Sequence, residues 1–248
     1  MHDMFSRAPE VASADCTTAV LPVGATEQHG PHLPVGTDTL IASAFAEGLA
    51  RRLDAYLLPP VAIACSMEHR ESRATVYLRP ETLSAVVRDV ADSLDRSGFR
   101  RLVVVSGHGG NWVLKPAVRE INRTAAIRVL LLQTMTVAAG KLSGVLAHPQ
   151  GDVHAGEKET SLILHLHPEC VGPLPEGSHA GRYPQDFLDY FDIGRLTGEG
   201  VWGFPADATA EKGARVLETY LDAALEYIES YERALREAEG GGRSAKKG

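Results

Sequence analysis

Short apolar runs alternate with amphipathic segments along the first half of the chain. The apolar runs have the length and composition typical of buried strands, and they lie at 17–24, 55–64, 100–107 and 127–134. Between them, apolar residues recur at helical spacing over 39–53, 79–98 and 111–125. This alternation predicts an α/β fold, with a mostly parallel sheet that carries helices on its faces.

Proline residues refine two of these elements. Pro59 and Pro60 indicate that the second strand is irregular or lies at an edge of the sheet, because proline cannot donate a ladder hydrogen bond. Pro116 falls within the third amphipathic segment, where it could kink the helix.

The second half of the chain is less regular. A helix is indicated over 156–171, and a long final helix over 209–238. Between them, 171–206 is rich in glycine and proline; so long a loop is often a lid, a pocket wall or a subunit contact, and an inert surface excursion is the equal alternative. We expect one domain over 1–238, followed by a disordered tail over 239–248.

Composition narrows the classes of partner. The chain has 248 residues, 44% of them hydrophobic, which is enough for one sizeable core. Its net charge of −7 argues against a nucleic-acid partner. No apolar run nears the roughly 18 residues of a membrane span, and we find no signal peptide. Three scattered cysteines indicate buried thiols in a reducing compartment, so we expect a cytoplasmic protein; they are Cys16, Cys65 and Cys170.

The loop after the first strand, "GATEQHGPHLPVGTD", concentrates acid and imidazole groups. They are Glu27, His29, His32 and Asp38. Glu27 and His29 lie two positions apart on an extended segment, so their side chains point to the same side. Such oxygen and nitrogen donors suit Zn²⁺, Mn²⁺ or Fe²⁺. The alternative is that Asp38 or Thr37 only caps the next helix, while the other groups are solvated.

A second polar cluster, "SGHGGN", follows the strand over 100–107 and places His108 among glycines. In parallel sheets, ligands bind beyond the carboxyl ends of the strands, so both clusters are expected at the same edge. The alternative is a tight turn with an incidental histidine. A phosphate-binding loop is not indicated, because "GxxxxGK[ST]" is missing.

A third cluster, "GDVHAGEKETS", contributes His154, Glu157 and Glu159. Two helical steps rotate by about 200°, so only one of the two glutamates is expected to point inward. The alternative for each is an interaction with the helix dipole. The serine-esterase motif "GxSxG" and the zinc-protease motif "HExxH" are both missing. The mixed Glu, His and Asp set therefore indicates water activated by a metal ion.

Three motifs together resemble the creatininase (creatinine amidohydrolase) family. They are "PVGATEQHGPHLPVGTD", "SGHGGN" and "HAGEKETS". The resemblance implies a three-layer α/β/α fold, one or two divalent ions (Zn, Mn or Fe), hydrolysis of a carbon–nitrogen amide-type bond in a small molecule, and a homohexamer. Carried over by motif, the metal ligands would be Glu27, His29, Asp38 and His108. Asp38 would bridge two ions, and His154 would be the acid/base histidine. Our own mechanistic hypothesis adds Glu157 as a helper of His154 in moving a proton to the leaving nitrogen.

Two departures from that family affect the expectations. Creatininase itself has a glutamate two positions after the ligand histidine, where this chain has Gly110; we expect Glu159 to be the further ligand. The segment 66–83 lacks the family's aromatic-Pro-Gly-Thr run, so creatinine is not the expected substrate. The alternatives are a peptidase that trims a modified precursor peptide, a hydrolase of a sugar- or polyol-derived carbonyl compound, and a metal-binding scaffold without turnover.

Overall fold

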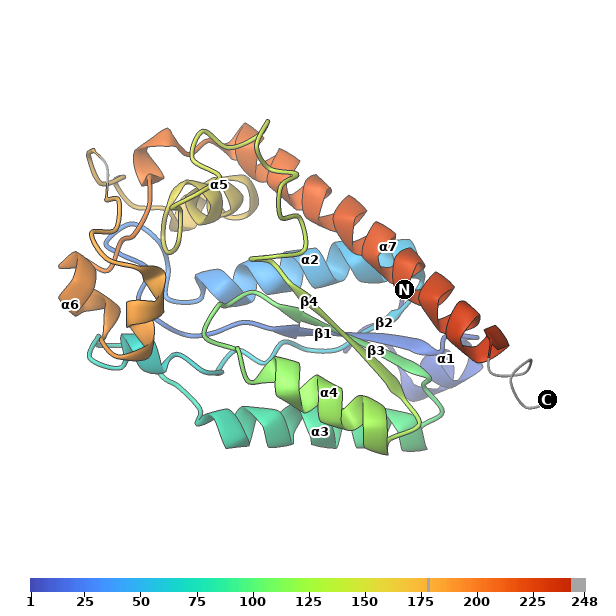
Figure 1. Ribbon diagram of the computed structural model, residues 1–248. Helices are drawn as coiled ribbons and strands as arrows, with labels where there is room; N and C mark the ends of the chain where they lie inside the picture. The colour runs from blue at the N-terminus through green and yellow to red at the C-terminus, as the bar shows by residue number, and fades with distance from the viewer. Residues whose placement is uncertain (178, 242–248) are drawn as a thin grey trace.

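The computed structural model describes residues 1–177 and 179–241 (Figure 1). Its strands form a parallel sheet in the order β2-β1-β3-β4. The strands are β1 (Thr18–Val23), β2 (Tyr56–Leu57), β3 (Arg101–Ser106) and β4 (Arg128–Gln133). The predicted α/β class with a parallel sheet is confirmed.

Helices cover both faces of the sheet (Figure 1). One layer contains α2 (Thr37–Leu53), α5 (Glu157–Leu166) and α7 (Ala210–Gly241). The other contains α3 (Pro80–Arg96) and α4 (Leu114–Thr124). Successive strand residues alternate between the two cores, as the pleat requires: Val103 and Val105 face the first layer, while Leu102 and Val104 face the second. This is the expected three-layer arrangement.

Several boundaries differ from the sequence prediction. The second strand is reduced to Tyr56–Leu57, although Leu58 and Val61 still donate backbone hydrogen bonds to β1. Pro116 lies in the first turn of α4, where a missing N–H costs nothing, so it causes no kink. The helix predicted over 156–171 ends at Leu166, and a 3₁₀ turn, η2 (Pro168–Cys170), follows it.

Short elements complete the described chain. They are α1 (Ala8–Ser13), η1 (Met67–His69), η3 (Gln185–Asp189), α6 (Ile193–Thr197) and η4 (Pro205–Asp207). The final helix extends to Gly241, three residues beyond the predicted end at 238; 242–248, most of the predicted tail, lie outside the described residues. Of the cysteines, Cys65 is buried but Cys170 is exposed, contrary to expectation. Within the described residues, we find no helix suited to crossing a membrane.

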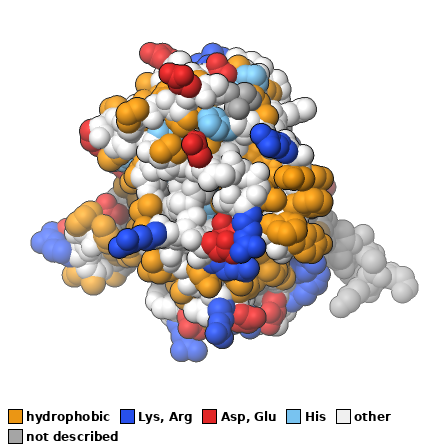
Figure 2. Space-filling model, turned by 90° about the vertical axis from the view of Figure 1, so that its left-hand side faces the viewer, with side chains coloured by type: hydrophobic (Ala, Val, Ile, Leu, Met, Phe, Trp, Pro, Cys, Tyr) orange, Lys and Arg blue, Asp and Glu red, His pale blue; other side chains and the backbone are white. Residues whose placement is uncertain are grey.

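The carboxyl ends of β1 and β3 lie level with each other, since Val23 pairs with Ser106. The loops that follow these strands therefore leave the sheet side by side, at the end of the molecule where α6 lies (Figure 1). Figure 2 views this end directly and shows hydrophobic side chains interspersed with charged ones of both signs. The polar clusters of the sequence meet at this edge.

Candidate metal centre

The loop after β1 is folded back on itself, which places Glu27 and His29 beneath the start of α2. The backbone N–H of Glu27 donates to Val35 O at 3.0 Å, and the Thr39 hydroxyl donates to Ala25 O at 2.9 Å. The helix cap is Gly36, and among the described residues α2 has no side-chain cap. Asp38 is thus a buried residue of the first turn, and the capping alternative is wrong.

The turn after β3 carries His108 into the same place. The Asn111 side chain bonds the loops together, because it accepts from Cys65 N at 3.1 Å and donates to Gly24 O at 3.0 Å. A Cβ on Gly107 would lie 2.4 Å from the carbonyl oxygen of Asp38. Glycine is therefore needed there for the close approach of α2 to the end of β3.

The loop before α5 supplies His154, and the first turn of α5 supplies Glu159. His154 is fixed by a pair of backbone hydrogen bonds with Trp202, at 3.0 and 2.9 Å. Ala155 adopts the left-handed conformation, with φ of 50°, and donates its N–H to Glu159 Oε2 at 2.7 Å. The turn thereby aims both side chains at the sheet edge.

These side chains form overlapping groups of potential metal ligands, with donor atoms within 4.8 Å of one another. The groups are Glu27/Asp38/His108, His29/Asp38/Glu159 and Glu27/His29/His154. Asp38 belongs to two of them: its Oδ2 lies 3.2 Å from His108 Nδ1, and its Oδ1 lies 3.4 Å from His29 Nε2. The structure therefore brings together every residue that was predicted to bind metal.

Several potential metal-ligand atoms in this cluster are buried and make no hydrogen bond with the described residues. None of the following has a hydrogen-bond partner among the residues that the structure describes: Glu27 Oε1 and Oε2, His29 Nε2, Asp38 Oδ2 and His108 Nε2. Buried polar atoms left in this state are costly. The atoms lie close together but are not aligned for hydrogen bonds with one another, which fits the shared coordination of cations. Carboxylate oxygen and imidazole nitrogen are ligands of first-row divalent ions.

The shifted pKa values of the cluster also favour a positive charge next to its carboxylates. Burial raises the pKa of Glu27 well above its usual value. Burial opposes charge on His29, but the Asp38 carboxylate outweighs it and raises the His29 pKa to about 9. His108 is likewise raised well above its usual pKa, against burial, by Glu27 and Asp38. These shifts show that a positive charge beside the carboxylates is favoured in this cluster, and a bound cation would supply one.

Two residues of η1 join the cluster, although the sequence analysis did not select them. His69 Nε2 lies 3.2 Å from Glu27 Oε1, and Glu68 Oε1 lies 3.2 Å from His108 Nε2. The segment is held there by Val76, which donates its N–H to Thr26 O at 3.0 Å. The available signal was an acidic residue beside a histidine within 66–83, a segment with no strong strand to place it.

Gln28 connects two of the histidines and fixes their protons. Its side-chain oxygen accepts from Gly30 N at 2.9 Å, so its amide nitrogen faces His69 Nδ1 at 2.9 Å and donates there. His154 Nε2 lies 2.8 Å from the backbone oxygen of Gln28 and must carry the proton of that hydrogen bond. This leaves His154 Nδ1 unprotonated, 3.7 Å from Glu27 Oε1.

Glu157 does not take part in this centre, and the predicted helper role is wrong. Its oxygens accept from Ala147 N at 2.9 Å and from His148 N at 2.8 Å, and it forms an ion pair with Lys212. It is not among the described residues that line the pocket. Its carboxylate instead ties the loop before α5 to the start of α7.

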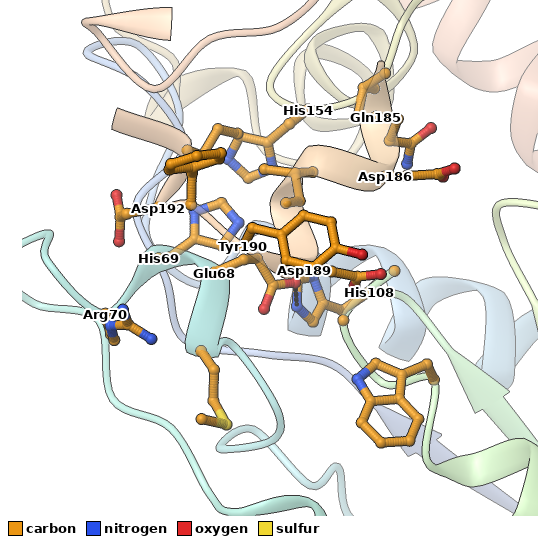
Figure 3. Close-up of a pocket in the computed structure, with 18 of the residues that line it drawn as sticks. Glu68, His69, Arg70, His108, His154, Gln185, Asp186, Asp189, Tyr190 and Asp192 are labelled. Atoms are coloured by element: carbon orange, nitrogen blue, oxygen red, sulfur yellow. Dashed lines mark ion pairs between the residues drawn. The ribbon is translucent and has the colours of Figure 1, made fainter. Parts of the chain in front are cut away.

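A pocket of about 870 Å³ opens onto the cluster (Figure 3). Its floor includes Asp38, Glu68, His108, His154 and Glu159. Part of its wall comes from residues within 185–193, which include η3 and the first residue of α6. Of the alternatives for the loop 171–206, a pocket wall is therefore the one that the described residues support.

Comparison with known proteins places these features in a family. Residues 4–228 match the family model for creatininase, creatinine amidohydrolase. A mycofactocin precursor peptide peptidase of Mycobacterium tuberculosis (strain CDC 1551 / Oshkosh) is 36% identical over 220 residues, which covers 82% of this chain and 81% of the relative. A creatinine amidohydrolase of Pseudomonas putida is 30% identical over 237 residues, with coverages of 88% and 90%.

Solved structures agree with the sequence comparison. A mutant creatininase described as Zn-Zn type superimposes with a TM-score of 0.78 at 26% identity, covering 92% of this chain and 97% of the other. The family model spans most of the chain, and the ligand cluster matches a metal-dependent activity. The chain therefore belongs to the creatininase family of metal-dependent amidohydrolases.

Proposed function

We propose that the protein hydrolyses a carbon–nitrogen amide bond with the help of two divalent ions, zinc, manganese or iron. Glu27, Asp38 and His108 would hold one ion, and His29, Asp38 and Glu159 the other. The observation that carries the proposal is the set of unpartnered buried atoms from separate loops, with Asp38 common to both groups. Ions bound there would lower the pKa of a water molecule from about 15.7 towards 7 and polarise a carbonyl group.

His154 is the acid/base residue of the proposal. Burial holds its pKa well below the usual value, and the neighbouring His29 and His69 lower it further. Its ring is therefore neutral, and the bond to Gln28 O leaves Nδ1 free to accept a proton. A proton held at that atom is in position to be passed to a leaving nitrogen.

The first candidate substrate is a small molecule that contains an amide bond. A volume of about 870 Å³ lies in the upper part of the range for small-molecule sites, roughly 300–1,000 Å³. A peptidase is the second candidate, because this volume also suits the end of a peptide and because a relative at 36% identity is described as a peptidase.

Assembly and location are proposed from kinship and composition. The proposed hexamer would bury some of the exposed apolar side chains near the pocket mouth, among them Met67 and Trp112. The proposed location is the cytoplasm. Light scattering of the purified protein tests the hexamer, and a mass near that of one chain would contradict it.

The variant Asp38→Ala tests the proposed function. Because Asp38 serves both ion sites, we expect the variant to lose both ions and all hydrolysis of amides, lactams, formamides and short peptides. Metal analysis and product detection are the measurements, and Asp89→Ala, on the exposed face of α3, is the matched control. Full metal loading together with unchanged turnover in Asp38→Ala would refute the shared-ligand role.

A further inference from the structure

Glu68 reaches the metal centre from a different part of the chain than the other ligands. It lies in η1, between β2 and α3, and Figure 3 shows its side chain turned towards His108. Glu68 Oε1 is 3.2 Å from His108 Nε2, and the same nitrogen is 3.1 Å from Glu27 Oε2. Two carboxylates thus approach one imidazole nitrogen.

Gly110 explains why this position is open to Glu68. A Cβ built on Gly110 would lie 2.1 Å from Glu68 Oε1 and 2.4 Å from His108 Nε2. The carboxylate of Glu68 therefore occupies the volume that any side chain on residue 110 would enter. The chain fills this place beside His108 from η1, because the loop that carries His108 offers only a glycine.

The Glu68 carboxylate is largely buried beside His108, since its side chain is only 17% exposed. His108 Nε2 is itself buried and, among the described residues, lacks a hydrogen-bond partner, despite the two carboxylates beside it. This unpartnered nitrogen and the nearby carboxylates of Glu27 and Glu68 are of the types that bind a divalent cation.

We propose that Glu68 is a ligand of the ion held by Glu27, Asp38 and His108. The inference rests on the proposed function, since it needs that ion, and it gives this site a fourth protein donor. It also links the site to the pocket wall. The N–H of Glu71 donates to Asp192 Oδ2 at 2.8 Å, and the Glu71 carboxylate is paired with Arg195 at 2.6 Å. The position of η1, and with it that of Glu68, is thereby fixed from α6.

The variant Glu68→Gln tests this assignment, with Glu81→Gln, on the exposed first turn of α3, as its matched control. Both exchange one carboxylate for an amide of the same shape. Metal content and chelator competition should show two ions in the wild type and in Glu81→Gln. In Glu68→Gln one ion should bind at least tenfold more weakly, while the other is retained. With manganese, electron paramagnetic resonance should change from a coupled pair to a single-ion signal.

A conservative variant and a thermal measurement separate ligation from a structural role. Glu68→Asp keeps the carboxylate, and we expect it to retain both ions more firmly than Glu68→Gln. If Glu68 only pairs with His108, Glu68→Gln will melt earlier without ions but will show the wild-type gain in Tm and wild-type affinity when ions are added. That result overturns the inference and leaves the proposed function intact. A wild-type protein that binds no divalent ion overturns both.

Discussion

At the scale of single residues, Gln28 fixes the protons of two histidines in the candidate centre. Its side-chain amide donates to His69 Nδ1, and its backbone oxygen accepts from His154 Nε2. The nitrogen atoms that face the cluster are thereby His69 Nε2–H and an unprotonated His154 Nδ1.

Replacement of Gln28 by methionine should therefore impair catalysis more than metal binding. The variant Gln28→Met keeps the length of the side chain but removes the amide that orients His69. Loss of a group that orients active-site side chains typically lowers metal affinity or activity by about 10- to 100-fold. We expect kcat to fall by about that factor, with metal content unchanged. Steady-state kinetics on metal-analysed protein measures both, and wild-type kcat would contradict the orienting role.

The sequence predicted the proposed metal ligands better than the residues around them. Glu27, His29 and His108 follow strong apolar strands, and the carboxyl ends of parallel strands share one edge, so their convergence could be foreseen. Glu68 and His69 could not be placed, because their position depends on tertiary contacts such as the bond from Val76 N to Thr26 O. Local periodicity carries no information on such contacts.

At the scale of elements, the first turn of α5 separates two neighbouring acids. Glu159 faces the cluster and Glu157 faces the other way, as a rotation of about 200° over two residues requires. The helical pattern predicted this divergence. It could not show which acid lies inward, because that depends on the loop before α5 and on Lys212.

The variant Glu157→Gln should consequently lower stability and leave the metal centre intact. The amide loses the ion pair with Lys212 and can accept from only one of the backbone N–H groups of Ala147 and His148. Loss of partners for buried polar groups costs about 1–3 kcal/mol. Denaturant unfolding should show a decrease of that size, with the wild-type metal content. If the variant lost metal without losing stability, Glu157 would instead belong to the metal centre.

The packing of α5 against α7 depends on a glycine at the crossing. A Cβ on Gly213 would lie 1.9 Å from the backbone oxygen of Ser161. The Ser161 backbone cannot move away without shifting α5. Overpacking of this kind lowers the free energy of unfolding by about 1–3 kcal/mol. Gly213→Ala should therefore destabilise the protein by about this amount, although alanine is the better helix former.

Gly48→Ala is the matched control for this prediction. Its Cβ in α2 would meet the end of the Leu221 side chain at 2.9 Å, and that side chain can move. The change in the free energy of unfolding should stay within about 1 kcal/mol, because the helix propensity of alanine compensates for the shift. Equal effects of the two variants in thermal melts would contradict the packing argument.

At the scale of the whole molecule, bound ions should stabilise the complete fold. The ligands come from the loop after β1, from α2, from the turn after β3 and from α5, so an ion that binds them binds only the folded chain. Ions present at a hundred times their Kd add about 2.7 kcal/mol to the stability. Chelators should lower Tm accordingly. The proposed single domain further predicts one cooperative transition with and without ions, which calorimetry can measure.

The same analysis with Asp38→Ala provides the control. This variant should melt at one temperature whether zinc is added or removed, because its ion sites are lost. A zinc-dependent rise in its Tm equal to that of the wild type would show that the stabilising ions bind elsewhere.

The wide spacing of the ligands has a consequence for biosynthesis. A nascent chain that has passed Asp38 and His108 still lacks Glu159, and α5, which carries Glu159, packs against α7 (Ala210–Gly241). We therefore expect the proposed ions to bind only after α5 and α7 have been made and packed together. They would bind a largely folded protein and would not guide the folding of a short segment, as zinc does in small finger domains.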